Sequence, residues 1–209
     1  MTSNAFYHEG SLELQRQQHT TQLAAHIRTR YVTDYLTDTA ATMIETADCV
    51  FLATADAAGR PDCSYKGGLP GFIRVIDPQT IAIPNYDGNG MFRSLGNITV
   101  NPAVGMLFID FVNPARLRIN GHASVHTSGE IVGEFTDADA VTIVTVEQAF
   151  ENCPRYIHNH ATGEYSPHCP RPNYQPPDPE WKLKPEYDGI VRRTSSSAVA
   201  LDTGDSKSR

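Results

Sequence analysis

The 209-residue chain has few cationic side chains, few cysteines and no long apolar run. Its 17 lysines and arginines are outnumbered by 24 aspartates and glutamates, so the formal net charge is −7. A protein that binds duplex nucleic acid usually needs a basic face, and no run of lysine or arginine occurs here. No apolar run approaches the length of a membrane span. With 40% hydrophobic and 20% charged residues, the composition is typical of a soluble globular protein.

The first ten residues have neither a basic start nor an apolar core, so we expect no secretory signal and a cytoplasmic location. The cysteines are widely spaced, without a C-x-x-C pair. In a chain without an export signal, such cysteines are expected to be free thiols. They are Cys49, Cys63, Cys153 and Cys169.

Short apolar segments, separated by turns about every ten residues, dominate the middle of the chain. Few segments have the periodicity of a helix: residues 11–31 predict one or two amphipathic helices, and residues 38–47 predict another with Asp38 as N-cap. This rhythm favours a mainly β fold, an antiparallel barrel with flanking helices, over a parallel sheet. The expected strands are 49–55, 62–66, 72–76, 80–84, 104–112, 116–125 and 141–146.

The most informative stretch is residues 85–102, where two glycines follow a strand and precede a short helical pattern. Met91, Leu95 and Ile98 have the spacing of one helix face, which places Arg93 and Ser94 in the first turn. The first turn of a helix presents free backbone N–H groups and the positive end of its dipole. Glycines before it allow the backbone to surround an anion. The stretch therefore predicts a phosphate site, although a plain turn with a solvated arginine fits almost as well.

The chain divides by composition into four parts. Residues 1–37 predict a helical arm, and residues 38–157 the barrel domain. Residues 158–193 are rich in proline and histidine, with Trp181 as an anchor, and we expect an irregular extension that packs on the barrel or on a partner. Residues 194–209 have the composition of a mobile tail.

A group of cysteines and histidines lies near the start of this extension, and thiolates and imidazoles are the ligands that zinc prefers. Its spacing, C-x4-H-x-H-x7-H-C, matches no zinc module with a physical rationale. We therefore expect a histidine-rich loop and no metal site. The residues are Cys153, His158, His160, His168 and Cys169.

The order of these elements is similar to that of a known family. Ala-Thr-Ala-Asp ends an apolar strand, Gly-Arg-Pro-Asp follows, and the next strand carries Lys-Gly-Gly. Then come Pro-Gly-Phe-Ile-Arg-Val, Gly-Asn-Gly-Met-Phe-Arg-Ser-Leu-Gly-Asn-Ile, Leu-Phe-Ile-Asp-Phe and Arg-Leu-Arg-Ile-Asn-Gly. Over about residues 38–157 the chain resembles the FMN-binding split β-barrel flavoproteins related to pyridoxamine 5′-phosphate oxidase. The resemblance implies an antiparallel, Greek-key-like split barrel and a homodimer with FMN at the subunit interface.

The resemblance also implies which residues hold the cofactor. One strand runs along the flavin ring, a loop lies beside the ribityl chain and phosphate, and a basic and polar pair holds the phosphate. A further basic residue, Lys66 or Arg74, lies near the phosphate, and Arg116 reaches the flavin from the partner subunit. The full set is Ser64, Tyr65, Lys66, Gly67, Arg74, Asn85, Tyr86, Asp87, Gly88, Asn89, Gly90, Arg93, Ser94 and Arg116.

The chain departs from the true oxidase in two places. Residues 67–71 interrupt the strands, and no clear equivalent of the oxidase's C-terminal substrate segment is present. We therefore expect an FMN-dependent oxidoreductase that acts on a small heterocyclic or conjugated substrate held over the flavin, rather than vitamin B6 oxidation. A non-catalytic flavin-binding, sensing or storage protein is the alternative, and the same barrel with a deazaflavin or haem is a further one.

No catalytic side chain is identified, because the flavin itself carries the electron chemistry. His122 lies on the polar face of its strand, where a solvated or hydrogen-bonded histidine is commoner than a catalytic one.

Overall fold

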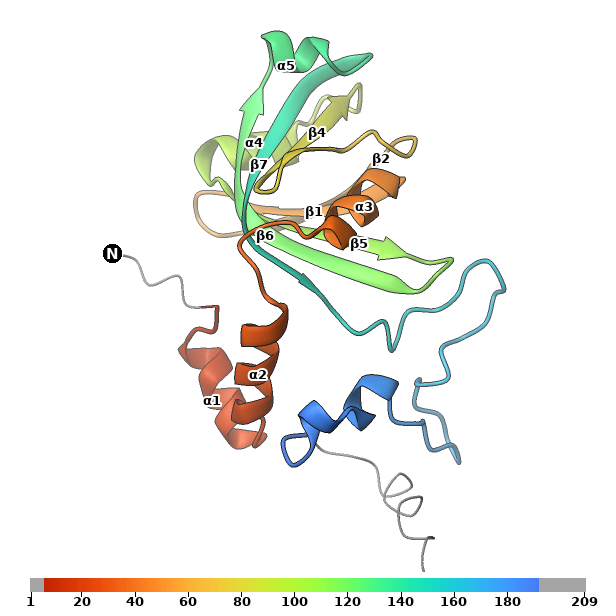
Figure 1. Cartoon of the computed structure of the whole chain (residues 1–209). Coiled ribbons are helices and arrows are strands. Elements are labelled where there is room, and N and C mark those ends of the chain that lie inside the picture. Colours follow the sequence, from red (N-terminus) through yellow and green to blue (C-terminus); the bar gives the residue numbers. More distant parts are fainter. Residues whose placement is uncertain (1–5, 192–209) are drawn as a thin grey trace, which may run out of the picture. The chain divides into compact units, whose positions relative to one another are not determined.

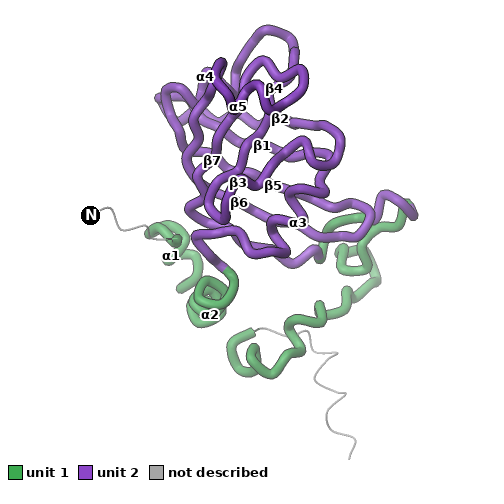
Figure 2. The backbone as a smooth tube through the Cα atoms, turned by 45° about the horizontal axis from the view of Figure 1, so that its top comes forward, with its two compact units in different colours: residues 1–31, 155–158, 163–209 green, residues 32–154, 159–162 purple. Residues whose placement is uncertain are grey.

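The computed structural model describes residues 6–191, and this part of the chain forms two compact units (Figure 2). Unit 2 contains residues 32–154 and 159–162. Unit 1 contains the residues before 32, residues 155–158 and those from 163 onward. The predicted tail at 194–209 lies outside the described residues. The sheet and the cavity beside α4 (Arg93–Val100) both belong to unit 2.

Unit 2 is built on one antiparallel sheet of seven strands, with the order β2-β1-β5-β6-β7-β4-β3. β2 and β3 are the two edges, and they do not pair with each other, so the sheet is an open or split barrel (Figure 1). The expected mainly β, split-barrel fold is confirmed. The strands are β1 (Cys49–Ala55), β2 (Pro61–Gly67), β3 (Arg74–Asp77), β4 (Thr80–Tyr86), β5 (Ala103–Asp110), β6 (Ala115–His126) and β7 (Ala138–Glu151).

The long strands β6 and β7 curve and join the two halves of the sheet (Figure 1). A bulge lies where the register shifts between Asn120 and Gly121. A bulge increases the local twist and bends its strand, which a sheet needs in order to curl. A Cβ on Gly121 would lie 2.0 Å from the carbonyl oxygen of Thr145 on β7. Only glycine therefore allows the two backbones to approach this closely.

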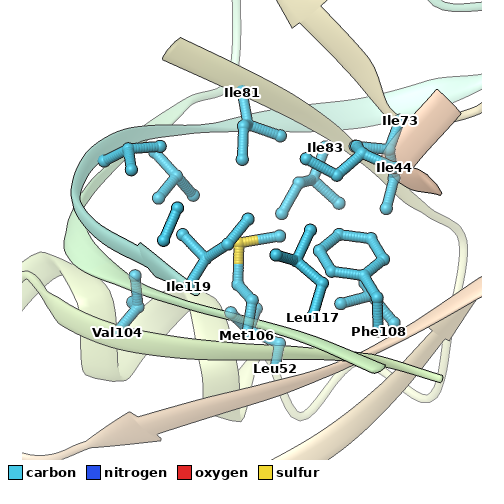
Figure 3. Close-up of a cluster of buried hydrophobic side chains, with 14 of the residues drawn as sticks. Ile44, Leu52, Ile73, Ile81, Ile83, Val104, Met106, Phe108, Leu117 and Ile119 are labelled. Atoms are coloured by element: carbon cyan, nitrogen blue, oxygen red, sulfur yellow. The ribbon is translucent and has the colours of Figure 1, made fainter. Parts of the chain in front are cut away.

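The core of unit 2 lies inside the curve of the sheet (Figure 3). Alternation along each strand sends every second side chain inward, because successive residues of a strand point to opposite faces. β6 shows this, since Leu117 and Ile119 are fully buried whereas Arg118 is exposed. Other fully buried side chains include Ile44, Leu52, Ile73, Ile81, Ile83 and Phe108.

α3 (Asp38–Thr46) and α4 pack on this sheet close to the predicted positions. Arg93 and Ser94 lie in the first turn of α4 as expected, but both helices differ from the prediction at their N-terminal ends. α3 has Thr37 as its N-cap, because the Thr37 side chain accepts a hydrogen bond from the Ala40 N–H; the expected Asp38 cap was wrong. α4 starts two residues after Met91, which therefore does not belong to its apolar face. α4 packs against β1, β2 and β6 and buries Ile98, while α3 packs against β3 and buries Ile44.

Unit 1 contains α1 (Glu9–Gln17), α2 (Thr21–Tyr31) and two short 3-10 helices, η1 (Glu180–Leu183) and η2 (Pro185–Tyr187). Tyr187 is buried and donates a hydrogen bond of 2.8 Å to the hydroxyl of Tyr31. Trp181 and His26 each pack edge-on against its ring. Trp181 thus contacts Tyr187 within the same extension, and the expectation that it anchors this extension on the barrel or on a partner stays a prediction.

A short helix not expected from the sequence, α5 (Glu130–Gly133), precedes β7 and packs against it. Among residues 6–191, no helix has the combination of length and apolar character that crossing a bilayer requires.

The close approach at the bulge predicts that Gly121→Ala destabilises the protein by about 3 kcal/mol or more, because the ladder between β6 and β7 must open. Thermal or denaturant unfolding measures this loss. The control is Gly96→Ala in α4, where no atom lies within 4 Å of the added Cβ. This control is expected to gain up to about 1 kcal/mol, since alanine is the better helix former. Equal stability of the two variants would contradict the account of the bulge.

Candidate functional site

A cavity of about 350 Å³ opens beside the first turn of α4, and it lies entirely within unit 2. Alternate residues of β2, the end of β4, and the loop and first turn of α4 form most of its wall. The start of β7 completes it. The lining residues are Asp62, Ser64, Lys66, Asn85, Tyr86, Asp87, Gly88, Asn89, Gly90, Met91, Phe92, Arg93, Ser94, Leu95 and Asp139.

The loop into α4 has a conformation that leaves backbone N–H groups available. Gly90 and Phe92 both adopt left-handed backbone conformations, with φ of 74° and 49°. The Asn89 side chain accepts a hydrogen bond from the Met91 N–H, which tightens the turn. Phe92 is the N-cap residue of α4 and provides no side-chain cap. The first N–H groups of α4 therefore lack the acceptor that a capping side chain would supply, and a bound anion is an alternative acceptor.

Two serines connect the edge strand to the helix. Ser64 on β2 and Ser94 in the first turn of α4 form a hydrogen bond of 2.9 Å between their hydroxyls. Only one of the two protons is needed for this bond. Since each hydroxyl also has two lone pairs, the pair keeps donor and acceptor capacity for a ligand. Ser94 is otherwise buried.

Two cations line the cavity, and one carboxylate faces both. The Nε atom of Arg93 lies 3.4 Å from an Asp62 carboxyl oxygen. Lys66 is half-buried, and burial lowers the pKa of its ammonium group from the ordinary value, while the charge of Asp62 partly offsets this shift. Burial therefore penalises the Lys66 charge in this site. An anion bound next to Lys66 would relieve that penalty.

Asn85 supplies an unused acceptor at the wall of the cavity. Its Nδ2 donates a hydrogen bond of 2.9 Å to the Thr142 hydroxyl. Its Oδ1 is buried and has no hydrogen-bond partner among the described residues. Buried polar atoms are rarely left unpaired, because desolvation without a hydrogen bond is costly. A donor on a ligand is one way to satisfy this atom.

The structure brings most of the predicted site residues to this cavity. From the predicted set, the lining contains Ser64, Lys66, Asn85, Tyr86, Asp87, Gly88, Asn89, Gly90, Arg93 and Ser94. Tyr65 points to the opposite face of β2, where its ring packs edge-on against Phe51. Gly67 ends β2 outside the lining, and a Cβ on it would meet the Tyr65 ring.

The two basic residues left open as phosphate ligands, Lys66 and Arg74, have different surroundings. The Arg74 guanidinium donates to the backbone oxygen of Glu134 at 2.8 Å and forms an ion pair with the Glu134 carboxylate at 3.3 Å. It also lies over the Phe135 ring, 4.3 Å from the ring centroid. Arg74 is therefore engaged away from the cavity, whereas Lys66 lines it.

Arg116 lies at a second cavity of about 700 Å³, between α3 and the adjoining ends of β5, β6 and β7. Its Nε atom is buried without a hydrogen-bond partner among the described residues. It does not line the first cavity of its own chain. Its expected contact with a flavin from the partner subunit stays a prediction.

Sequence reasoning missed five residues of the lining: Asp62, Met91, Phe92, Leu95 and Asp139. Asp62 could have been found, since it alternates with Ser64 and Lys66 and so shares their face of β2. Asp139 could not, because it reaches the cavity only through the pairing of β7 with β4.

No histidine is among the residues that line the cavity. The His122 Nδ1 atom lies 2.9 Å from a carboxyl oxygen of Glu147. In the extension, the His158 ring accepts a hydrogen bond from the Ser166 N–H, and the His160 ring stacks on Phe111. No group of three or more histidine, cysteine or acidic side chains within residues 6–191 has the arrangement of a metal site.

A protein-family model described as pyridoxamine 5′-phosphate oxidase matches residues 36–186. The chain belongs to this family. The match covers both the sheet and the cavity, and it extends past residue 157 into the segment 158–193 that the sequence set apart as an extension. No curated protein matches the chain significantly.

Three solved structures are similar to the chain at low identity. A Lactobacillus delbrueckii protein assigned as a pyridoxamine 5′-phosphate oxidase is 23% identical, with a TM-score of 0.46 over 56% of this chain and 95% of its own. An FMN-binding protein from Syntrophomonas wolfei is 10% identical, with a TM-score of 0.40 over 68% and 97%. HutZ, the haem storage protein from Vibrio cholerae, is 19% identical, with a TM-score of 0.35 over 63% and 93%.

The left-handed backbone of Phe92 is strained for a bulky residue, and 64% of its surface is exposed. Asparagine tolerates this conformation, so Phe92→Asn is expected to stabilise the protein by about 1 kcal/mol and to raise Tm by roughly 2–4 °C. Thermal unfolding measures the change.

The control is Met91→Asn, because Met91 is equally exposed at 65% and has no positive φ. Its Tm should stay within about 1 °C of the wild-type value, as exposed substitutions usually have small effects. A lower Tm for Phe92→Asn would show that the ring contributes more packing than its backbone costs.

Proposed function

We propose that the cavity binds FMN and that the protein is an FMN-dependent oxidoreductase. The observation that carries this proposal is the convergence of Lys66, Arg93 and the Ser64–Ser94 hydroxyl pair at the uncapped first turn of α4. Cations, hydroxyls and free N–H groups together are the chemistry of a phosphate site. The family match supports a cofactor of the flavin type.

The surroundings of this phosphate site also fit the rest of a flavin. β2 is an edge strand, so half of its backbone N–H and C=O groups have no partner strand. Such groups can pair with the polar edge of an isoalloxazine ring, and the unused Asn85 oxygen can accept from a ribityl hydroxyl. Among the residues that line the cavity there is no histidine or cysteine, which favours a flavin over haem.

Bound FMN would supply the redox chemistry, by taking up and returning a hydride or single electrons. The chain's residues would bind and orient it, with Lys66 and Arg93 on the phosphate. A small heterocyclic or conjugated substrate would then stack over the exposed ring face. Reduction by a nicotinamide donor and rapid reoxidation by an acceptor would distinguish an oxidoreductase from a flavin-storage or flavin-sensing protein.

Replacement of Lys66 by methionine tests the phosphate assignment. Loss of one charge-assisted hydrogen bond costs about 2 kcal/mol, so Lys66→Met should weaken FMN binding roughly thirtyfold. Riboflavin has no phosphate, and its affinity should not change. Fluorescence titration with both flavins measures the two dissociation constants.

Arg74→Met is the matched control, because it removes the other candidate cation. It should leave FMN affinity within about twofold, since Arg74 is paired with Glu134. Equal losses in the two variants, or an equal loss for FMN and riboflavin, would refute the assignment of the phosphate to Lys66.

We further propose a homodimer, on the basis of an apolar face of the sheet that unit 2 buries only in part: Phe51 and Leu107 are partly buried and Tyr65 is exposed. Phe51 lies opposite both Tyr65 and Leu107 in the register, so the three side chains share the outer face of β1, β2 and β5. Tyr65 is 63% exposed. A C2 pair, which is the commonest closed assembly, would bury this face on both subunits.

Sedimentation equilibrium at micromolar concentration tests the dimer. The expected mass is twice that of the 23.0 kDa chain. Tyr65→Glu places a charge on the proposed interface and should shift the mass toward one chain, whereas Tyr156→Glu, at an exposed residue of unit 1, should not. A wild-type mass equal to one chain would contradict the proposal.

A further inference from the structure

Asp62 occupies a position that a simple phosphate site would not contain. It shares one face of β2 with Ser64 and Lys66, because alternate residues of a strand point the same way. It also lies 3.4 Å from the Arg93 Nε, so one carboxylate faces both cations of the cavity. The Asp62 side chain is only 23% exposed, whereas that of Arg93 is 61% exposed.

The charges of the cavity are not balanced for a phosphate. Three carboxylates line it, those of Asp62, Asp87 and Asp139, against the two cations Lys66 and Arg93. Side chains at alternate positions of a strand are about 7 Å apart. A phosphate bound between Lys66 and the Ser64–Ser94 pair would therefore be close enough for the Asp62 carboxylate to repel it. Phosphate and Asp62 would also both pair with Arg93.

We propose that Asp62 is a specificity-determining residue that competes with the ligand phosphate for Arg93 and Lys66. The inference rests on the proposed FMN function. Arg93 is the mobile partner in this competition, since its side chain is largely exposed and its contact with Asp62 is long. Phosphate binding draws Arg93 away from Asp62, and the cost of that exchange lowers the affinity for the phosphorylated flavin. The affinity for a flavin without phosphate is not affected.

Asp62→Asn tests the competition, because it removes the charge and keeps the size and one acceptor oxygen. FMN should bind about tenfold more tightly to the variant, while riboflavin affinity stays within about twofold. The control is Asp77→Asn, which makes the same change of net charge at the end of β3, outside the lining of the cavity. The Asp77 side chain accepts a hydrogen bond from the Gln79 N–H there, and asparagine preserves this turn. The control should leave both affinities unchanged.

The outcomes separate this inference from the proposed function. If wild type binds FMN and Asp62→Asn binds it equally or more weakly, Asp62 does not compete and the inference is wrong. Equal tightening of FMN and riboflavin would also overturn it, because the effect would not involve the phosphate. If neither protein binds FMN, the proposed function is wrong and the inference falls with it.

A second measurement uses the wild-type chain alone, in case the variant does not fold. The Arg93 Nε–Hε resonance, assigned by its absence in Arg93→Lys, reports the contact of Arg93 with Asp62. Saturation with FMN should shift this resonance, whereas riboflavin should leave it in place. An Arg93 resonance that does not move with FMN would contradict the exchange.

Discussion

The candidate site depends on how the first turn of α4 is attached to the edge strand β2. The Ser64–Ser94 hydrogen bond joins them at the cavity, and one turn further along Asn97 donates to the Thr54 hydroxyl at 3.0 Å. Ile98 then enters the core on the same helix. These contacts hold the N-terminal end of the helix dipole over alternate residues of β2. Without them, neither the free N–H groups nor Arg93 would have a defined position relative to Lys66.

The local backbone explains why this turn can receive an anion. Gly90 and Phe92 adopt left-handed conformations, and the N-cap position offers no side-chain acceptor. A helix that begins without a capping side chain is less stable, so the chain loses local stability at the place where a ligand would supply the missing hydrogen-bond acceptor. The same reasoning applies to Asn85, whose buried oxygen has no partner within the described residues. One ligand with a phosphate at one end and hydroxyl groups beside it, as proposed for FMN, would satisfy both features.

Much of the fold and most of the cavity could be predicted from the sequence, because both depend on local patterns. The strand expected at 116–125 corresponds to β6, which extends one residue further at each end, and the glycines before Arg93 identified the loop. The exact first residue of α4 could not be predicted. The spacing of Met91 and Leu95 is that of a helix containing both residues, but the left-handed backbone of Phe92 makes the helix begin at Arg93. Contacts between distant segments could not be predicted either. The contacts of Arg74 with Glu134 distinguish it from Lys66 as a phosphate ligand, and Asp139 reaches the cavity only because β7 pairs with β4.

The central claim is that this cavity holds FMN, and a visible absorption spectrum of the freshly purified full-length protein tests it most directly. The released chromophore is then identified by mass, and added FMN is offered if the protein is colourless. The account predicts a flavin spectrum and the mass of FMN, either at purification or after reconstitution. A protein that is colourless and takes up no added FMN, or that releases a different chromophore, would contradict it.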